Sequence, residues 1–141
     1  MAEQLLRTQD SCIDVASAGL SDEEVGNPMN PVSARVLADH GVEVGDHRAQ
    51  QVDEQMLADA DLAVAMTKRH RAGLERLVEQ LPPGQRPRIV MLREIGEPEL
   101  AEDGEPLDVD DPWYGGPADH EAVYQILAAH LPGIRDALPP A

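Results

Sequence analysis

The segment Asp110–Gly115 holds the side chains best suited to acid–base chemistry. It reads Asp-Asp-Pro-Trp-Tyr-Gly, so two aromatic rings follow a pair of carboxylates. Pro112 fixes its own φ and pushes Asp111 into an extended conformation, which projects that carboxylate from the chain. A carboxyl group beside apolar surface is more easily kept protonated, which suits a general acid acting on a leaving group. The alternative is an acidic turn ahead of a helix, with the rings covering a sheet edge.

Two further polar side chains sit where a ligand site is expected. Ser17 opens the turn Ser-Ala-Gly after a stretch with strand character, and open α/β sheets bind ligands at the carboxyl ends of their strands. His47 lies in the connector 45–52 and can hydrogen-bond toward the same region. The alternatives are a plain strand-end turn and a loop histidine. The remaining histidines lack paired ligand spacing, so we interpret them as solvated or structural and predict no metal site; they are His40, His70, His120 and His130.

Helical and strand patterns alternate along the chain and are expected to position these groups. The residue patterns predict helices over 1–9, 30–41, 53–59, 67–81 and 119–130, and strands over 12–16, 62–66 and 88–92. A long acidic loop is predicted over 96–116. This order is typical of a small parallel α/β sheet with flanking helices. We predict a single domain over 1–141 that ends in a weakly ordered tail over 134–141.

Composition excludes several classes of protein. The chain has 141 residues and a formal net charge of −16, which disfavours binding to nucleic acid or to a membrane surface. Its one cysteine, Cys12, can form neither an internal disulfide nor a cysteine-rich zinc site, and this fits a reducing cytoplasm. The apolar runs are too short to cross a bilayer, and the first residues do not resemble a signal peptide.

In their order and spacing, several segments resemble the low-molecular-weight protein-tyrosine phosphatases, whose fold is shared by the thiol-dependent arsenate reductases. Residues 1–3 (Met-Ala-Glu) resemble the start of the helix that follows the family's phosphate-binding loop. The other matching segments are 17–19 (Ser-Ala-Gly), 26–28 (Gly-Asn-Pro) with the helix 34–41, 45–49 (Gly-Asp-His-Arg-Ala), Met66 at a strand end, and 111–115 (Asp-Pro-Trp-Tyr-Gly).

The resemblance implies a three-layer α/β/α fold and a role for each candidate residue. Asp111 would protonate the departing phenolate oxygen and later deprotonate the water that hydrolyses a cysteinyl-phosphate. Trp113 and Tyr114 would line the wall that holds the substrate ring. Ser17 and His47 would hydrogen-bond to the phosphate-binding loop and hold its shape. The substrate would be a phosphotyrosine protein or a small aryl phosphate, with no cofactor and no metal.

The sequence departs from the family at its front. The family's nucleophile lies in a Cys-x5-Arg loop between the first strand and the first helix, and this sequence contains no such motif. Cys12 is no substitute, because the residue six positions later is Ala18 and because we expect Cys12 to be a small buried side chain of a strand. We therefore predict that the first strand and the phosphate-binding loop are missing, that Met1 is an internal methionine, and that the chain as written hydrolyses no phosphoester.

Three other interpretations remain at this stage. In these alternatives the chain would be a non-catalytic relative that acts as a binding module, an arsenate reductase on the same fold, or a plain acidic structural domain. Arsenate reduction needs additional cysteines, and none follows Cys12. A structural domain leaves the Asp111 loop and the pairing of Ser17 with His47 as coincidences.

Overall fold

The computed structural model describes residues 1–139. The chain divides into two compact units: one combines Met1–Gln51 with Asp111–Ala129, and the other combines Val52–Asp110 with the residues from His130 onward. The prediction of one domain over 1–141 stays a prediction. No helix among residues 1–139 is long and apolar enough to span a membrane.

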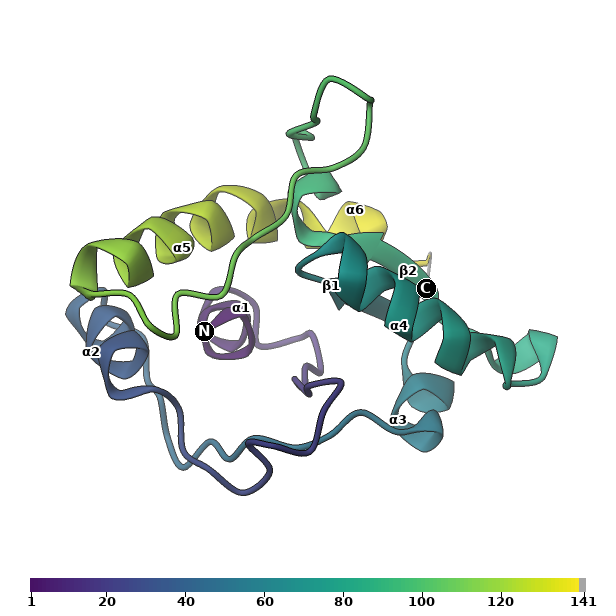
Figure 1. The fold of residues 1–141 in the computed structure, drawn as a ribbon, viewed down its shortest axis with the longest axis horizontal. Helices are drawn as coiled ribbons and strands as arrows, with labels where there is room; N and C mark the ends of the chain where they lie inside the picture. The colour runs from purple at the N-terminus through teal and green to yellow at the C-terminus, as the bar shows by residue number, and fades with distance from the viewer. Residues whose placement is uncertain (140–141) are drawn as a thin grey trace. The chain divides into compact units, whose positions relative to one another are not determined.

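A parallel pair of strands organises the second unit. Strands β1 (Leu62–Ala65) and β2 (Arg88–Met91) pair in register, with Leu62 opposite Arg88 and Ala65 opposite Met91. Parallel strands need a long crossover connection, and here it contains helix α4 (Lys68–Glu79) and the 3₁₀ turn η1 (Pro83–Gln85). Helix α4 contacts both strands (Figure 1). The predicted strands over 62–66 and 88–92 are thus confirmed to within one residue.

Local capping explains where the helices of this unit begin. The Thr67 hydroxyl accepts a hydrogen bond from the His70 N–H at 3.1 Å, ahead of α4. Helix α3 (Glu54–Asp59) begins in the same way, because the Asp53 carboxylate accepts from the Met56 N–H at 2.8 Å. The short elements η2 (Leu92–Glu94), η3 (Leu131–Gly133) and α6 (Ile134–Ala137) complete the unit.

The core of the second unit is aliphatic, as the low aromatic content predicts. Fully buried Met91 and Leu92 follow each other at the end of β2, and Leu131 and Ile134 are buried around η3 and α6. One backbone contact in this core demands glycine. A Cβ on Gly133 would lie 2.7 Å from the Cα of Gly96, closer than real Cβ atoms approach another atom.

The predicted tail over 134–141 begins with helix α6, and its first residue, Ile134, is buried. Burial of this apolar side chain gives the segment an anchor that the sequence pattern alone does not indicate. Residues 140–141 lie outside the described residues, so the weak order predicted for the end of the chain stays a prediction.

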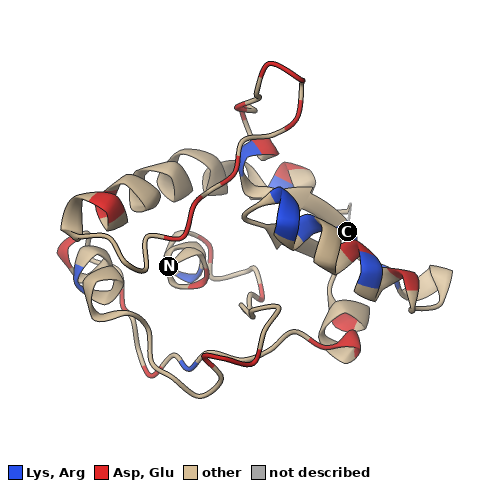
Figure 2. Ribbon diagram, viewed as in Figure 1, with Lys and Arg blue, Asp and Glu red and all other residues tan. Residues whose placement is uncertain are grey.

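The loop that follows η2 carries acidic residues (Figure 2), and hydrogen bonds hold its base. Glu99 accepts hydrogen bonds from His130 Nε2 at 2.6 Å and from Arg93 Nη2 at 3.2 Å, and Arg93 Nη1 donates to the Asp108 carbonyl at 2.9 Å. His130 Nδ1 also lies 2.9 Å from the Ile95 carbonyl, so both ring nitrogens face oxygen acceptors. The segment is therefore a tethered hairpin rather than a free solvated run.

The first unit is built from helices α1 (Ala2–Gln9), α2 (Pro31–Asp39) and α5 (Pro117–His130), the last of which ends in the second unit. Helix α2 lies beside the beginning of α5 (Figure 1). The buried pair Ser33 and His120 joins them through Oγ and Nδ1 at 2.7 Å. His40 adds a 2.7 Å contact to Glu121 and stacks on Tyr124 with the ring centroids 3.8 Å apart. His120 and His40 are structural residues here, as the sequence predicts.

The strand predicted over 12–16 is wrong. No regular strand occupies these residues, because within residues 1–139 no neighbouring strand forms a ladder with them. The alternation that suggested a strand survives in the burial pattern, since Ile13 and Val15 are half-buried whereas Cys12 and Asp14 are exposed. The expected burial of Cys12 is therefore also wrong. A parallel bridge follows only later in the chain, from Gly19 to Gln51.

The base of the acidic hairpin offers a pH test. Hydrogen bonds from His130 and then Arg93 hold the pKa of the Glu99 carboxyl below its ordinary value. The stability that the charged Glu99 carboxylate contributes is full above its pKa in the unfolded chain, about 4.3. This stability is lost as the pH falls through the lower pKa of Glu99 in the folded chain. We expect Glu99→Gln to lower the free energy of unfolding at pH 6 by no more than about 1 kcal/mol, because such exposed ion pairs are weak.

Thermal unfolding between pH 6 and pH 3 checks this prediction. The difference between the parent chain and Glu99→Gln should shrink as the pH falls below about 4.3. Glu97→Gln, a neutralised exposed neighbour of the same hairpin, should show no such trend. A difference in thermal stability between the parent chain and Glu99→Gln that stays constant with pH would contradict the proposed role of the Glu99 carboxylate.

Candidate functional site

A buried carboxylate in the first turn of α1 is the centre of one cluster in the first unit. Glu3 is only 7% exposed. Its Oε1 accepts a hydrogen bond from Ser17 Oγ at 3.1 Å, and its Oε2 lies 3.5 Å from His47 Nδ1. Oε2 also lies 3.2 Å from Arg7 Nη1 and 3.1 Å from Gln4 Nε2. Ser17 and His47, which are far apart in the sequence, therefore meet at one carboxylate.

Physical chemistry accounts for the composition of this cluster. A buried carboxylate is costly unless a cation and hydrogen-bond donors surround it, and Arg7 supplies the cation one helical turn from Glu3. Arg7 also donates to the Val15 carbonyl at 2.9 Å, so it ties the segment after α1 to the helix. Gln50 donates to the Ser17 carbonyl at 3.0 Å, which ties the connector of His47 to the same turn.

The sequence analysis did not identify Glu3 or Arg7 as site residues. Their spacing of four residues on one helix was the available signal, but it is common on solvent-exposed helix faces and indicates nothing by itself. What distinguishes this pair is the burial of Glu3 and the approach of Ser17 and His47, which only the fold provides.

The Asp111 segment forms a tight, exposed turn in the same unit. The Asp111 Oδ1 accepts a hydrogen bond from the Trp113 N–H at 3.0 Å, and the Gly115 N–H donates to the Pro112 carbonyl at 2.7 Å. Trp113 is 41% exposed and Tyr114 is 99% exposed. The side chain of Tyr114 thus lies in solvent and covers no sheet edge, contrary to the alternative interpretation of this loop.

The loop then enters α5 through a contact that needs glycine. The Gly116 N–H donates to the Asp119 carboxylate at 2.9 Å. A Cβ on Gly115 would lie 2.6 Å from that same Asp119 oxygen, so a side chain at Gly115 would displace Asp119. The turn therefore requires glycine at position 115, and its geometry sets how the chain passes from Asp111 into α5.

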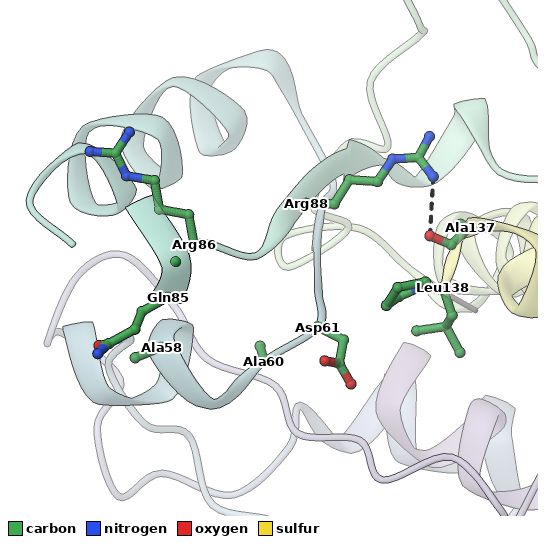
Figure 3. A pocket seen from close by; sticks show the side chains of 10 residues that line it. Ala58, Ala60, Asp61, Gln85, Arg86, Arg88, Ala137 and Leu138 are labelled. Carbon is green, nitrogen blue, oxygen red and sulfur yellow. Dashed lines mark hydrogen bonds between the residues drawn. The ribbon is translucent and has the colours of Figure 1, made fainter. Parts of the chain in front are cut away.

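The second unit contains a cavity of about 500 Å³ that includes none of the predicted site residues (Figure 3). Its two arginines are engaged with backbone. Arg86 donates to the carbonyls of Leu81 and Glu79, at 3.0 and 3.1 Å, and Arg88 donates to the Ala137 carbonyl at 3.1 Å. In Figure 3 the two guanidinium groups point apart. We therefore interpret these arginines as braces for the chain around the cavity.

Within residues 1–139, no three histidine, cysteine or acidic side chains are arranged to hold a metal ion. Cys12 is exposed, and its N–H donates to the Asp10 carboxylate at 3.1 Å. Neither observation supplies a nucleophile to the Asp111 loop. The chemistry that residues 1–139 present is the exposed Asp111 in a turn with two exposed aromatic residues, together with a buried, hydrogen-bonded carboxylate at Glu3.

Comparison with known proteins identifies the family of this chain. The family model described as low molecular weight phosphotyrosine protein phosphatase matches residues 1–139. The chain is 37% identical over 142 residues to low molecular weight protein-tyrosine phosphatase A of Mycobacterium tuberculosis, a match that covers 96% of this chain and 81% of that protein. It is 32% identical over 126 residues to a low molecular weight protein-tyrosine-phosphatase of Streptomyces coelicolor, covering 89% and 73% of the two chains.

Solved structures agree with this family. The Erwinia amylovora tyrosine phosphatase amsI matches with a TM-score of 0.76 at 28% identity, covering 99% of this chain and 83% of that one. Vibrio vulnificus Wzb, solved with benzylphosphonate, matches with a TM-score of 0.78 over 97% of this chain and 88% of that one; at 22% identity it shows the fold alone. The chain belongs to the low molecular weight protein-tyrosine phosphatase family of hydrolases and has its α/β fold.

The family assignment confirms the resemblance predicted from the motifs. It does not test whether a strand and a phosphate-binding loop precede Met1, and that truncation stays a prediction. The prediction that the chain is inactive is not supported by these comparisons, which favour the activity of the family.

The Glu3 cluster predicts a specific loss of stability. Glu3→Gln removes the charge that pairs with Arg7 and weakens the acceptor shared by Ser17 and His47. We expect a loss of about 1–3 kcal/mol in the free energy of unfolding, measured by urea titration. Glu43→Gln, an exposed change in the same unit, should stay within about 0.5 kcal/mol of the parent chain. Equal effects of the two variants would contradict this role of Glu3.

Proposed function

We propose that Asp111 is the general acid of a low molecular weight protein-tyrosine phosphatase reaction. The proposed substrate is a phosphotyrosine protein or a small aryl phosphate. One observation carries the proposal. The family match over residues 1–139 includes the sequence Asp-Pro-Trp-Tyr-Gly, and Asp111 is exposed in a turn that also carries the exposed residues Trp113 and Tyr114.

The reaction places two proton transfers on Asp111. A thiolate sulfur attacks phosphorus and the bond from phosphorus to the phenolic oxygen breaks, while the Asp111 carboxyl donates its proton to the departing oxygen. The resulting carboxylate then takes a proton from the water that attacks the cysteinyl-phosphate, which regenerates the thiolate and releases phosphate. The thiolate and its arginine would come from a Cys-x5-Arg segment, which residues 1–141 do not contain.

The neighbouring residues have supporting roles in this proposal. Trp113 and Tyr114 are both exposed in the turn, so their rings are available to hold an aryl ring. Ser17 and His47 are held by the buried Glu3 carboxylate, so they form a preformed polar surface suited to support a phosphate-binding loop. The family match supports the same class of substrate.

The assay compares two aryl phosphates on a chain that carries a Cys-x5-Arg segment upstream of Met1, taken from its own coding sequence. We expect Asp111→Asn to slow turnover of phenyl phosphate by about 10²- to 10⁴-fold, because its leaving group needs protonation. The loss should be smaller for p-nitrophenyl phosphate, whose leaving group is stable as an anion. The matched control is Asp110→Asn, which changes the adjacent carboxylate and should keep turnover near that of the parent.

The same assay on residues 1–141 alone tests the prediction of inactivity. Without a Cys-x5-Arg motif we expect no phosphate release above that of buffer. Turnover by this chain would show that prediction to be wrong. If Asp111→Asn and its parent are equally fast on phenyl phosphate, Asp111 is not the acid. If no upstream Cys-x5-Arg segment exists, the non-catalytic binding module becomes the better interpretation.

A further inference from the structure

The turn that carries Asp111 is connected to helix α2 by a continuous path of hydrogen bonds. Asn30, the N-cap of α2, accepts a hydrogen bond at its Oδ1 from the Val32 N–H at 2.8 Å. Its Nδ2 donates to the Trp113 carbonyl at 3.4 Å, and the Trp113 N–H donates to the Asp111 carboxylate at 3.0 Å. The backbone of a single residue, Trp113, thus lies between the side chain of Asn30 and the carboxylate of Asp111.

A second connection holds the exit of the turn to the same helix. The His120 N–H donates to the Gly116 carbonyl at 3.2 Å, and the His120 ring bonds to Ser33 at 2.7 Å with both side chains buried. Residues three positions apart lie on one helix face. From that face of α2, Asn30 contacts Trp113 in the turn and Ser33 contacts His120 in the helix that follows it. The 3.4 Å contact between Asn30 and Trp113 is long for a hydrogen bond. The bond between Ser33 and His120 holds α2 and α5 together, which keeps Asn30 and Trp113 within reach of each other.

We propose that Asn30 is a positioning residue for Asp111, because it holds the backbone of the acid turn at the N-terminus of α2. The inference rests on the proposed function for the role of Asp111 as the acid. A general acid must lie within hydrogen-bond reach of the leaving oxygen, and an exposed turn without such a support samples many positions. Nothing in the motif Asp-Pro-Trp-Tyr-Gly itself indicates this support.

The amide of Asn30 is the feature that permits both contacts. Among the residues that cap helices well, asparagine has an oxygen that accepts from the helix and a separate N–H₂ group that donates. Aspartate keeps the cap but offers only oxygens, which the Trp113 carbonyl repels. Serine keeps the cap with a shorter side chain and carries no charge. These two substitutions therefore remove the contact with Trp113 and leave the N-cap of α2 in place.

Trp113 supplies the probe for the experiment, because it is the single tryptophan of the chain. Acrylamide quenching and anisotropy of its fluorescence are measured on residues 1–141 for the parent, Asn30→Asp and Asn30→Ser, with thermal unfolding followed by circular dichroism. Since Trp113 is already 41% exposed, we expect quenching to rise by up to about twofold in both variants, with lower anisotropy. The unfolding midpoint should stay close to that of the parent, because all three residues cap the helix.

Asn27→Asp is the matched control for the charge change. Asn27 donates to Glu24 at 2.8 Å in the same unit, so this substitution adds the same charge in the loop that precedes α2. It should leave the quenching of Trp113 unchanged. Unchanged quenching in both Asn30 variants would overturn the proposal, and so would a change confined to Asn30→Asp, since serine also lacks the amide donor. The measurement needs no turnover, so a failure of Asp111 in the phosphatase assay is distinguishable from a failure of the support.

Discussion

A carboxylate that leaves water must find a cation and hydrogen-bond donors, and the first unit is organised around this requirement at Glu3. The constraint acts on segments that are distant in the sequence, because a helix supplies the cation of Arg7, a turn supplies the hydroxyl donor of Ser17, and a connector brings His47 Nδ1 to 3.5 Å from the carboxylate. Removing any one of them leaves a buried charge less well compensated. The polar surface of the candidate site is therefore also a condition for this part of the chain to fold.

Asp111 lies in the opposite environment, in an exposed turn whose backbone groups bond to each other and to the first turn of α2. The contrast suits the two roles that we propose for these residues. A surface that shapes a phosphate-binding loop benefits from burial, which fixes its groups, whereas an acid that meets a substrate must be accessible.

Local patterns predicted most elements of the fold correctly. The helices predicted over 30–41, 53–59 and 67–81 are present, with Asn30, Asp53 and Thr67 as their N-caps, and the apolar runs at 62–66 and 88–92 form the parallel pair. The failure at 12–16 has a clear cause. A strand is defined by hydrogen bonds to a neighbour, so its residues can keep the alternating burial of a strand while no described segment pairs with them.

The sequence by itself determined the caps, the strand pair, the motif Asp-Pro-Trp-Tyr-Gly and, through the order of the motifs, the family that the comparisons confirm. These features depend on residues a few positions apart, whose conformations follow from local sterics and hydrogen bonding. Only the tertiary structure decided that Glu3 receives Ser17 and His47, and that Ser33 meets His120, 87 positions away. Such contacts depend on the path of the whole chain, which brings together groups that no local pattern relates.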